Sequence, residues 1–371
     1  CRRVATAFDG PLTARLLDLL TPDRMVVLLK STTLAANVTG NSTGDATEPH
    51  YGTLHRPLDL PPALLARLAA PPAVASLSLP AANALLPDSF TLLSGAPPGR
   101  HEPPALADGA TTTRRLWHLA DTTYKLPTAE VRVRWAVPEV GASAEGGVMA
   151  SLLSSILAEQ RRSDRYDAER AGISADVSPS TFGFEVDASG FSQRLPEAVR
   201  RAVAAVTSMQ ISDDELALAK EKYARALAAT LTEQPAERAS QLTSKVLAEV
   251  AYLPAERSSA LQNVTRANLA AFADGILGRA VLKETLVIGN LDAAAARPIH
   301  DDGPRPPPDA QVTAAATQRI ANLEGRWVQY AEAAAHPKEA QSAVKLVVQL
   351  GRLPIQEAAV AQLLSAAISQ P

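Results

Sequence analysis

Apolar and charged residues alternate between residues 130 and 137. The apolar members are Val131, Val133, Trp135 and Val137, and the charged members are Glu130, Arg132 and Arg134. Because successive side chains of a β-strand point to opposite faces of its sheet, the alternation predicts a strand with one apolar and one charged face.

A helix, a hairpin and a second helix are predicted after this strand. The first helix carries one apolar stripe, formed by Met149, Leu152, Leu153 and Ile156. The hairpin is predicted from the alternating apolar residues Ile173, Ala175 and Val177, and then Phe182, Phe184, Val186 and Ala188, with a turn at Pro179 and Ser180. Gly190 closes the hairpin, and the stripe of the second helix comprises Val199, Ala202, Val203 and Val206. This order predicts an α+β fold in which helices pack on one face of an antiparallel or mixed sheet.

Three more helices and a strand are predicted between residues 212 and 288. Ser212 and Glu215 have the spacing of a capping box, which begins a helix containing Leu216, Ala219 and Tyr223. Pro235 begins a helix with Leu242, Val246 and Val250. Thr265 caps a helix with Leu269, Phe272, Ala273 and Ile276 on one face. Val281–Ile288 is predicted to be a strand.

Shorter elements are predicted toward both ends of the chain. Leucines at 12, 16, 17 and 20 and at 64, 65 and 68 predict two helices, and the apolar run Met25–Leu29 predicts a buried strand between them. Residues 32–49 have the composition of a loop. Near the other end, strands are predicted at Val328–Tyr330 and Val344–Leu350, and a helix at Ile355–Ile368.

Composition excludes several classes of protein. The 371 residues have a formal net charge of -3 and form no basic stripe interleaved with aromatic residues, so nothing favours nucleic-acid binding. No apolar run approaches the ~18 residues of a membrane span. Cys1 is the single cysteine, which rules out an internal disulfide and a cysteine-based metal cluster. A cytoplasmic or organellar matrix location is the simpler expectation.

The histidines do not form a zinc-binding motif. They are His50, His55, His101, His118, His300 and His336. No two stand four apart, so the chain lacks His-x-x-Glu-His, in which two histidines on one helix face ligate zinc and the glutamate activates water. His50 and His55 are five apart in a segment that resembles a loop, a poor match to one helix face.

Other chemical candidates have simpler interpretations. A charge-dense segment could bind an anionic partner, but mixed ion pairs at a solvated helix end explain it better; it comprises Glu159, Arg161, Arg162, Asp164, Arg165, Asp167, Glu169 and Arg170. Asp213, Asp214 and Glu215 could ligate a metal, although the capping box accounts for them. Trp117 and His118 could line a pocket, but a tryptophan at the edge of a core beside an exposed histidine is the favoured interpretation. The sequence has no Gly-x-Ser-x-Gly elbow and no glycine-rich phosphate loop.

Several short motifs resemble the insulinase (pitrilysin) family of zinc metallopeptidases, and specifically the third of four homologous domains in insulin-degrading-enzyme-like proteins. They are Leu116-Trp117 with Leu126-Pro127, Tyr166-x-Ala168 with Ala171-Gly172-Ile173, and Gly190-Phe191-Ser192-x-x-Leu195. Flanking matches are Tyr51-Gly52-Thr53, Gln234-Pro235 and Gly289-Asn290. Each motif alone is weakly specific, but they occur in the family's order over nearly the whole chain.

The resemblance implies two-layer metallohydrolase-like domains, one complete and two partial. Residues 1–70 would be the C-terminal part of a second peptidase-like domain, followed by a proline-rich linker at 71–110. Residues 111–299 would be the third, non-catalytic domain. A second linker would occupy 300–322, and 323–371 would begin a fourth domain that is truncated here.

The resemblance also implies a division of labour within a longer enzyme. Zinc would be bound upstream of Cys1, and a substrate-contacting arginine and tyrosine would follow Pro371. This chain would form chamber wall and a substrate-holding surface beside the catalytic N-terminal half, and would be inactive alone, with peptides as the substrates. An inactive scaffold or partner subunit of the same fold family, or a homologue with a degenerate first domain, is the alternative.

Overall fold

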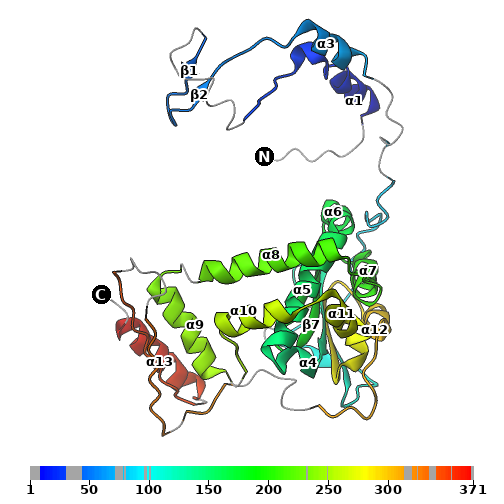
Figure 1. Ribbon diagram of the computed structural model, residues 1–371. Coiled ribbons are helices and arrows are strands. Elements are labelled where there is room, and N and C mark those ends of the chain that lie inside the picture. Colours follow the sequence, from blue (N-terminus) through cyan, green and yellow to red (C-terminus); the bar gives the residue numbers. More distant parts are fainter. Residues whose placement is uncertain are drawn as a thin grey trace. The chain divides into compact units, whose positions relative to one another are not determined.

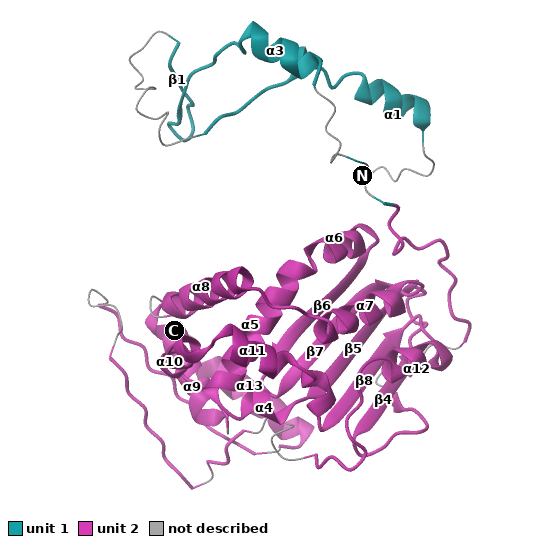
Figure 2. Ribbon diagram, turned by 45° about the vertical axis from the view of Figure 1, so that its right-hand side comes forward, with its two compact units in different colours: residues 1–81 teal, residues 82–371 magenta. Residues whose placement is uncertain are grey.

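The computed structural model describes residues 9–30, 44–71, 78, 81–95, 98–99, 102–230, 233–248, 250–312, 320–323, 325–333, 340–351 and 353–368. The chain forms two compact units, residues 1–81 and residues 82–371, coloured separately in Figure 2.

Unit 1 contains short elements with little buried surface. Its helices α1 (Gly10–Leu17) and α3 (Pro62–Ala69) confirm the two leucine patterns, and its two-residue strands β1 (Ala46–Thr47) and β2 (Leu54–His55) pair antiparallel. The predicted buried strand at Met25–Leu29 is wrong: these residues follow the short helix η1 (Pro22–Arg24), belong to no strand, and are exposed. Much of the predicted loop at 32–49 lies outside the described residues.

Unit 2 is built on a six-stranded mixed sheet (Figure 2). Its order is β3 (Ala105–Leu106), β4 (Arg114–Ala120), β8 (Leu282–Gly289), β5 (Thr128–Ala136), β7 (Gly183–Phe191) and β6 (Ile173–Ser180). The β4–β8 pair is parallel and the other pairs are antiparallel. The sheet confirms the α+β prediction, although the sequence pattern did not reveal β3 or β4.

Alternation along β5 sorts its side chains as predicted. Val131, Val133 and Trp135 are buried, whereas Arg132 and Glu130 are exposed on the opposite face. Phe184, Val186 and Ala188 of β7 continue the buried face.

The hairpin turn lies two residues later than predicted. Ser180 pairs with Gly183 and Pro179 with Phe184, so the turn residues are Thr181 and Phe182. β6 is the end strand of the sheet, and proline is tolerated there because the outer edge of such a strand needs no backbone N–H for the ladder. Gly190 lies in β7 with φ +135°, and a Cβ at this position would come within 2.2 Å of the Gly172 carbonyl oxygen. The close approach of the two arms therefore requires glycine.

Helices cover the apolar face of the sheet. α5 (Ala144–Gln160) and α6 (Arg162–Arg170) contact β6, α7 (Leu195–Thr207) contacts β6 and β7, and α12 (Ala293–Asp301) contacts β4 and β8. The predicted stripes of α5 and α7 are buried, apart from the half-buried Met149. α4 (Pro138–Gly141) precedes α5, and α8 (Asp213–Thr230), α10 (Pro254–Asn263), α11 (Arg266–Ala273) and η2 (Ile276–Arg279) extend this layer (Figure 1).

The structure differs from the sequence predictions at five further places. α9 (Pro235–Leu247) ends before Val250, because Ala248 forms a β-bridge with Ile320. The helices α10 and α12 were not predicted, and α12 crosses the expected boundary between residues 299 and 300. Residues 328–330 and 344–350 belong to no strand, whereas α13 (Ile355–Ile368) confirms the last predicted helix.

Part of the expected proline-rich linker is docked onto unit 2. Leu85 is fully buried in the core. The Asn290 side chain accepts a hydrogen bond from Leu93 N (2.7 Å) and donates to Thr91 O (2.8 Å). The side-chain oxygen Oε1 of Gln193 accepts hydrogen bonds from the backbone N–H groups of residues 88 and 89. Residues 83–93 are therefore held by amide side chains that bond to their backbone.

Candidate functional site

The described histidines do not fit a zinc site. His118 Nε2 donates to the carbonyl oxygen of Leu291 at 2.7 Å, and His300 Nδ1 lies 2.9 Å from Thr285 Oγ1. His50 and His55 lie in unit 1, both on its surface, and His101 and His336 lie outside the described residues. Within the described part of the chain, no group of three or more His, Cys, Asp or Glu could hold a metal ion.

The charge-dense segment forms ion pairs along α6 and its neighbours. Glu159 accepts from Arg162 at 2.5 Å and lies 3.7 Å from Lys222, and Arg165 pairs with Asp176 of β6 at 2.9 Å. These side chains are largely solvent-exposed, so each pair contributes about 0–1 kcal/mol to stability. The arrangement matches the simpler interpretation of the segment as a solvated helix end, except at Arg161, which is 6% exposed and pairs with Asp164 at 3.3 Å.

The carboxylates at the start of α8 have a structural role. Ser212 Oγ accepts from Glu215 N at 3.3 Å, and Ser212 N donates to Glu215 Oε2 at 3.0 Å, so the predicted capping box is confirmed. The Ser212 hydroxyl, together with the Gln160 amide, lowers the pKa of Glu215. Asp213 pairs with Arg266 at 3.1 Å.

Trp117 and His118 point to opposite faces of β4. His118 lies on the face covered by α12, whereas Trp117 is in register with Leu286 of β8 on the other face. They therefore do not line a common pocket, and His118 is half-buried and not exposed as expected.

The second face of the sheet, which we call the open face, has an apolar half and a charged half. The register places Trp117 and Leu119 of β4 beside Leu286 and Ile288 of β8. The charged half contains three ion pairs on β8, β5 and β7: Arg134–Glu284 and Arg134–Glu185, both at 3.9 Å, and Arg132–Asp187 at 2.5 Å. A fourth pair, Arg115–Glu284 at 3.4 Å, joins β4 to β8. Cross-strand pairs of this kind stabilise a sheet and fix its side chains in place.

A buried polar cluster lies on the opposite face, beneath α12. Lys283 and Thr285 of β8 are fully buried, and His300 of α12 is almost completely buried above them. Burial and the nearby Arg114 guanidinium lower the Lys283 pKa to about 8. Sequence patterns missed this cluster, although alternation along β8 places Lys283 and Thr285 on the same face as the apolar Val287.

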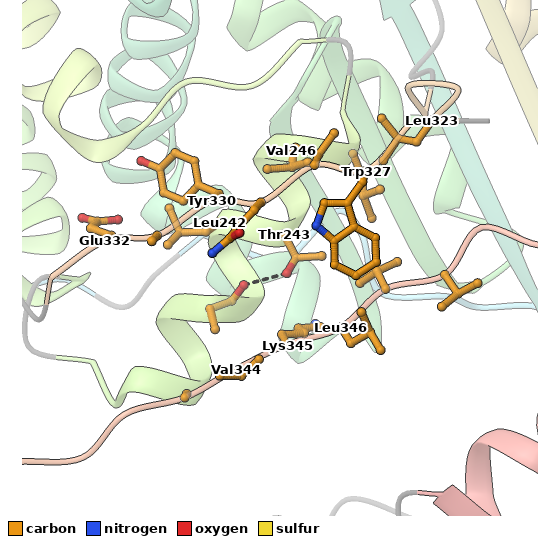
Figure 3. A pocket seen from close by; sticks show the side chains of 18 of the residues that line it. Leu242, Thr243, Val246, Leu323, Trp327, Tyr330, Glu332, Val344, Lys345 and Leu346 are labelled. Atoms are coloured by element: carbon orange, nitrogen blue, oxygen red, sulfur yellow. Dashed lines mark hydrogen bonds between the residues drawn. The ribbon is translucent and has the colours of Figure 1, made fainter. Parts of the chain in front are cut away.

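An open cleft of about 2110 Å³ lies between α9 and the segments 320–323, 325–333 and 340–351 (Figure 3). Leu242 and Val246 of α9 line it together with Trp327 and Leu346. An Arg238–Glu332 ion pair of 2.7 Å connects the helix to one wall, but Trp327 remains 84% exposed. The cleft is a junction whose apolar walls face solvent.

Comparison with known proteins decides the family. The family model described as the middle or third domain of peptidase M16 matches residues 2–260. The chain belongs to the peptidase M16 family.

Longer relatives support this M16 assignment. The chain is 26% identical to the insulin-degrading enzyme of Bos taurus over 289 residues, which cover 78% of this chain and 28% of that protein. It is 24% identical to the A-factor-processing enzyme of Saccharomyces cerevisiae, with 77% and 27% covered. The chain thus spans less than a third of the length of these relatives.

A solved structure shows the same fold. The crystal structure of pitrilysin aligns with a TM-score of 0.55 and 25% identity, and covers 64% of this chain and 24% of that one. Two-layer packing of a sheet against helices is therefore the fold of this M16 domain. Among the described helices, none is both long and apolar enough to cross a bilayer.

Proposed function

We propose that this chain is the non-catalytic middle portion of a zinc metalloendopeptidase that degrades peptides enclosed in a chamber, and that it forms part of the chamber wall. The match of the third-domain model to residues 2–260 carries this proposal. Further support comes from relatives that are named insulin-degrading enzyme and putative zinc protease. Zinc and the catalytic residues would be supplied by the N-terminal half of the same protein.

The open face is the surface that would hold the peptide. Helices α5, α7 and α12 pack on the other face, so they do not obstruct it. Its apolar half offers Trp117 and Leu286 to apolar side chains of a peptide. Its arginines are already paired with carboxylates, so the face keeps its shape when a peptide slides over it. Residues 323–371 would belong to the next domain.

Site-specific crosslinking tests the wall role. In a cysteine-free background of the full-length peptidase, Leu286→Cys on the open face and the control Leu218→Cys on α8 would each carry a photoreactive benzophenone. We expect a labelled peptide to crosslink at position 286, and excess unlabelled peptide to abolish the crosslink. Crosslinking at both positions alike, or only at 218, would overturn the proposal.

A second assay tests the predicted lack of activity. The 371-residue chain alone is expected to leave a fluorogenic peptide intact. Hydrolysis that a zinc chelator blocks would contradict that expectation.

A further inference from the structure

Three adjacent strands hold residues 301–304, which are the last residue of α12 and the three residues that follow it. Lys283 Nζ of β8 donates to the Asp302 carbonyl oxygen, and Trp135 Nε1 of β5 donates to Pro304 O at 3.1 Å. Arg114 of β4 pairs with Asp301 at 2.6 Å. Gly303 lies between these contacts. A Cβ on this residue would lie only 2.6 Å from Cγ1 of Val203, so there is no space for a side chain here. Residues 301–304 are therefore fixed against the sheet by groups from β4, β8 and β5.

The cation in the middle of this arrangement is buried. Lys283 is fully buried, and its ammonium group lies 5.0 Å from the centroid of the Trp135 ring. A buried ammonium is tolerated when it donates hydrogen bonds and contacts an aromatic face. The site therefore already holds one positive charge in a poorly solvated environment, and Arg114 adds a second one nearby.

His300 lies next to this charge and is neutral near pH 7. Burial is the main cause that lowers its pKa to about 4, followed by Lys283 of β8 and Arg114 of β4. On its own helix, Asp301 raises the pKa and Arg297 lowers it.

Further charges lie around the segment itself. Arg200 of α7 is electrostatically coupled to Asp302, and Arg305 hydrogen-bonds Asp301 O at 3.3 Å. The cations around His300 thus outnumber the single acid, Asp301, that favours its protonation.

We propose that Lys283, Trp135 and Arg114 form a latch that holds residues 301–304 on the sheet, and that protonation of His300 opens it. A proton on His300 would place a third cation beside Lys283 and Arg114, in a site from which water is largely excluded. The end of α12 moves away from the sheet, and the three contacts to residues 301–304 break. Acid thereby frees the chain that follows α12, while the rest of the sheet stays folded. The device is independent of the proposed function.

Fluorescence of Trp135 reports the latch directly. In the 371-residue chain with Trp117→Phe and Trp327→Phe, Trp135 is the remaining tryptophan, and excitation beyond the tyrosine absorption selects it. As the pH falls from 6.5 to 3, through the His300 pKa of about 4, we expect its emission to move to longer wavelength because its indole loses Pro304 and gains water. Far-UV circular dichroism is expected to stay unchanged over the same range. In His300→Gln, which can still bond Thr285 but does not titrate, the emission change should disappear.

His118→Gln is the matched control, because His118 bonds the chain just before α12 but makes no contact with residues 301–304. It should keep the parent transition. An unchanged transition in His300→Gln, an emission change that coincides with loss of circular dichroism, or no emission change at all would overturn the proposal. If His300→Gln fails to fold, NMR titration of the His300 ring decides: its midpoint must coincide with the Trp135 transition.

Discussion

Strand β5 and the segment 340–351 have the same alternating pattern but opposite outcomes. In β5, Val131 and Val133 alternate with arginines and are 2% and 1% exposed, because β7 and β8 pair with the strand on both sides. In the other segment, Val344, Leu346, Val348 and Leu350 alternate with Lys345 and Gln349, with Val347 as the one apolar exception. Val344 and Leu346 are nevertheless 97% and 73% exposed, and the segment belongs to no strand. Alternation therefore determines which side chains share a face, whereas burial requires partner strands and a covering layer.

Two tryptophans sharpen this comparison most: Trp135 of β5, and Trp327, which lines the same cleft as the segment 340–351. Trp135 is fully buried and bonds Pro304, whereas Trp327 is 84% exposed. Trp135→Ala is expected to lower the free energy of unfolding by about 4 kcal/mol, because it removes a large core side chain. Trp327→Ala should change it by less than about 0.5 kcal/mol. Urea denaturation measures both, and equal effects would show that the cleft is as well packed as the core.

Because Lys283 is buried beside β5, the free energy of unfolding is expected to depend on pH. Its pKa is about 8 in the folded chain, against a usual value of 10.5. Between these values the unfolded chain binds the proton and the folded chain does not, so the free energy of unfolding rises with pH. Over the whole window the rise amounts to at most about 3 kcal/mol. It should appear in the parent and vanish in Lys283→Met; parallel stability curves for the two proteins would contradict the buried-cation assignment.

Asn290 tests whether residues 83–93 belong to the folded part of unit 2. Asn290→Ala leaves Leu93 N and Thr91 O without their side-chain partner, which is expected to cost about 2 kcal/mol. Hydrogen exchange at Leu93 should accelerate more than exchange at Val131 in the core. Unchanged protection at Leu93 would show that the segment is held by Leu85 and its neighbours alone.

The sequence predicts features that depend on residues a few positions apart, such as the faces of helices and strands. It does not predict contacts between residues of different strands, which depend on the strand order. The stripes of α5 and α7 and the two faces of β5 could be predicted because each follows from a period of a few residues. The latch could not, because Arg114, Trp135 and Lys283 come from three strands far apart in the sequence, and the sheet order that makes them neighbours depends on the β4–β8 pairing. The strands predicted at Met25–Leu29 and 344–350 failed for the converse reason: the pattern was right but no described strand pairs with them.

Removal of the capping box of α8 is expected to have the smallest effect on the free energy of unfolding, and this effect comes from local hydrogen bonds. Ser212→Ala removes the acceptor for the Glu215 N–H and is expected to lower the free energy of unfolding by about 1 kcal/mol. The same change also removes the main cause of the lowered Glu215 pKa, so that pKa should rise. Denaturation and NMR titration of Glu215 measure the two effects. Ser212→Thr, which keeps the hydroxyl, should retain most of both, because the cap depends on one oxygen and not on tertiary contacts. A loss of stability in Ser212→Ala without a pKa change would mean that Ser212 acts through packing.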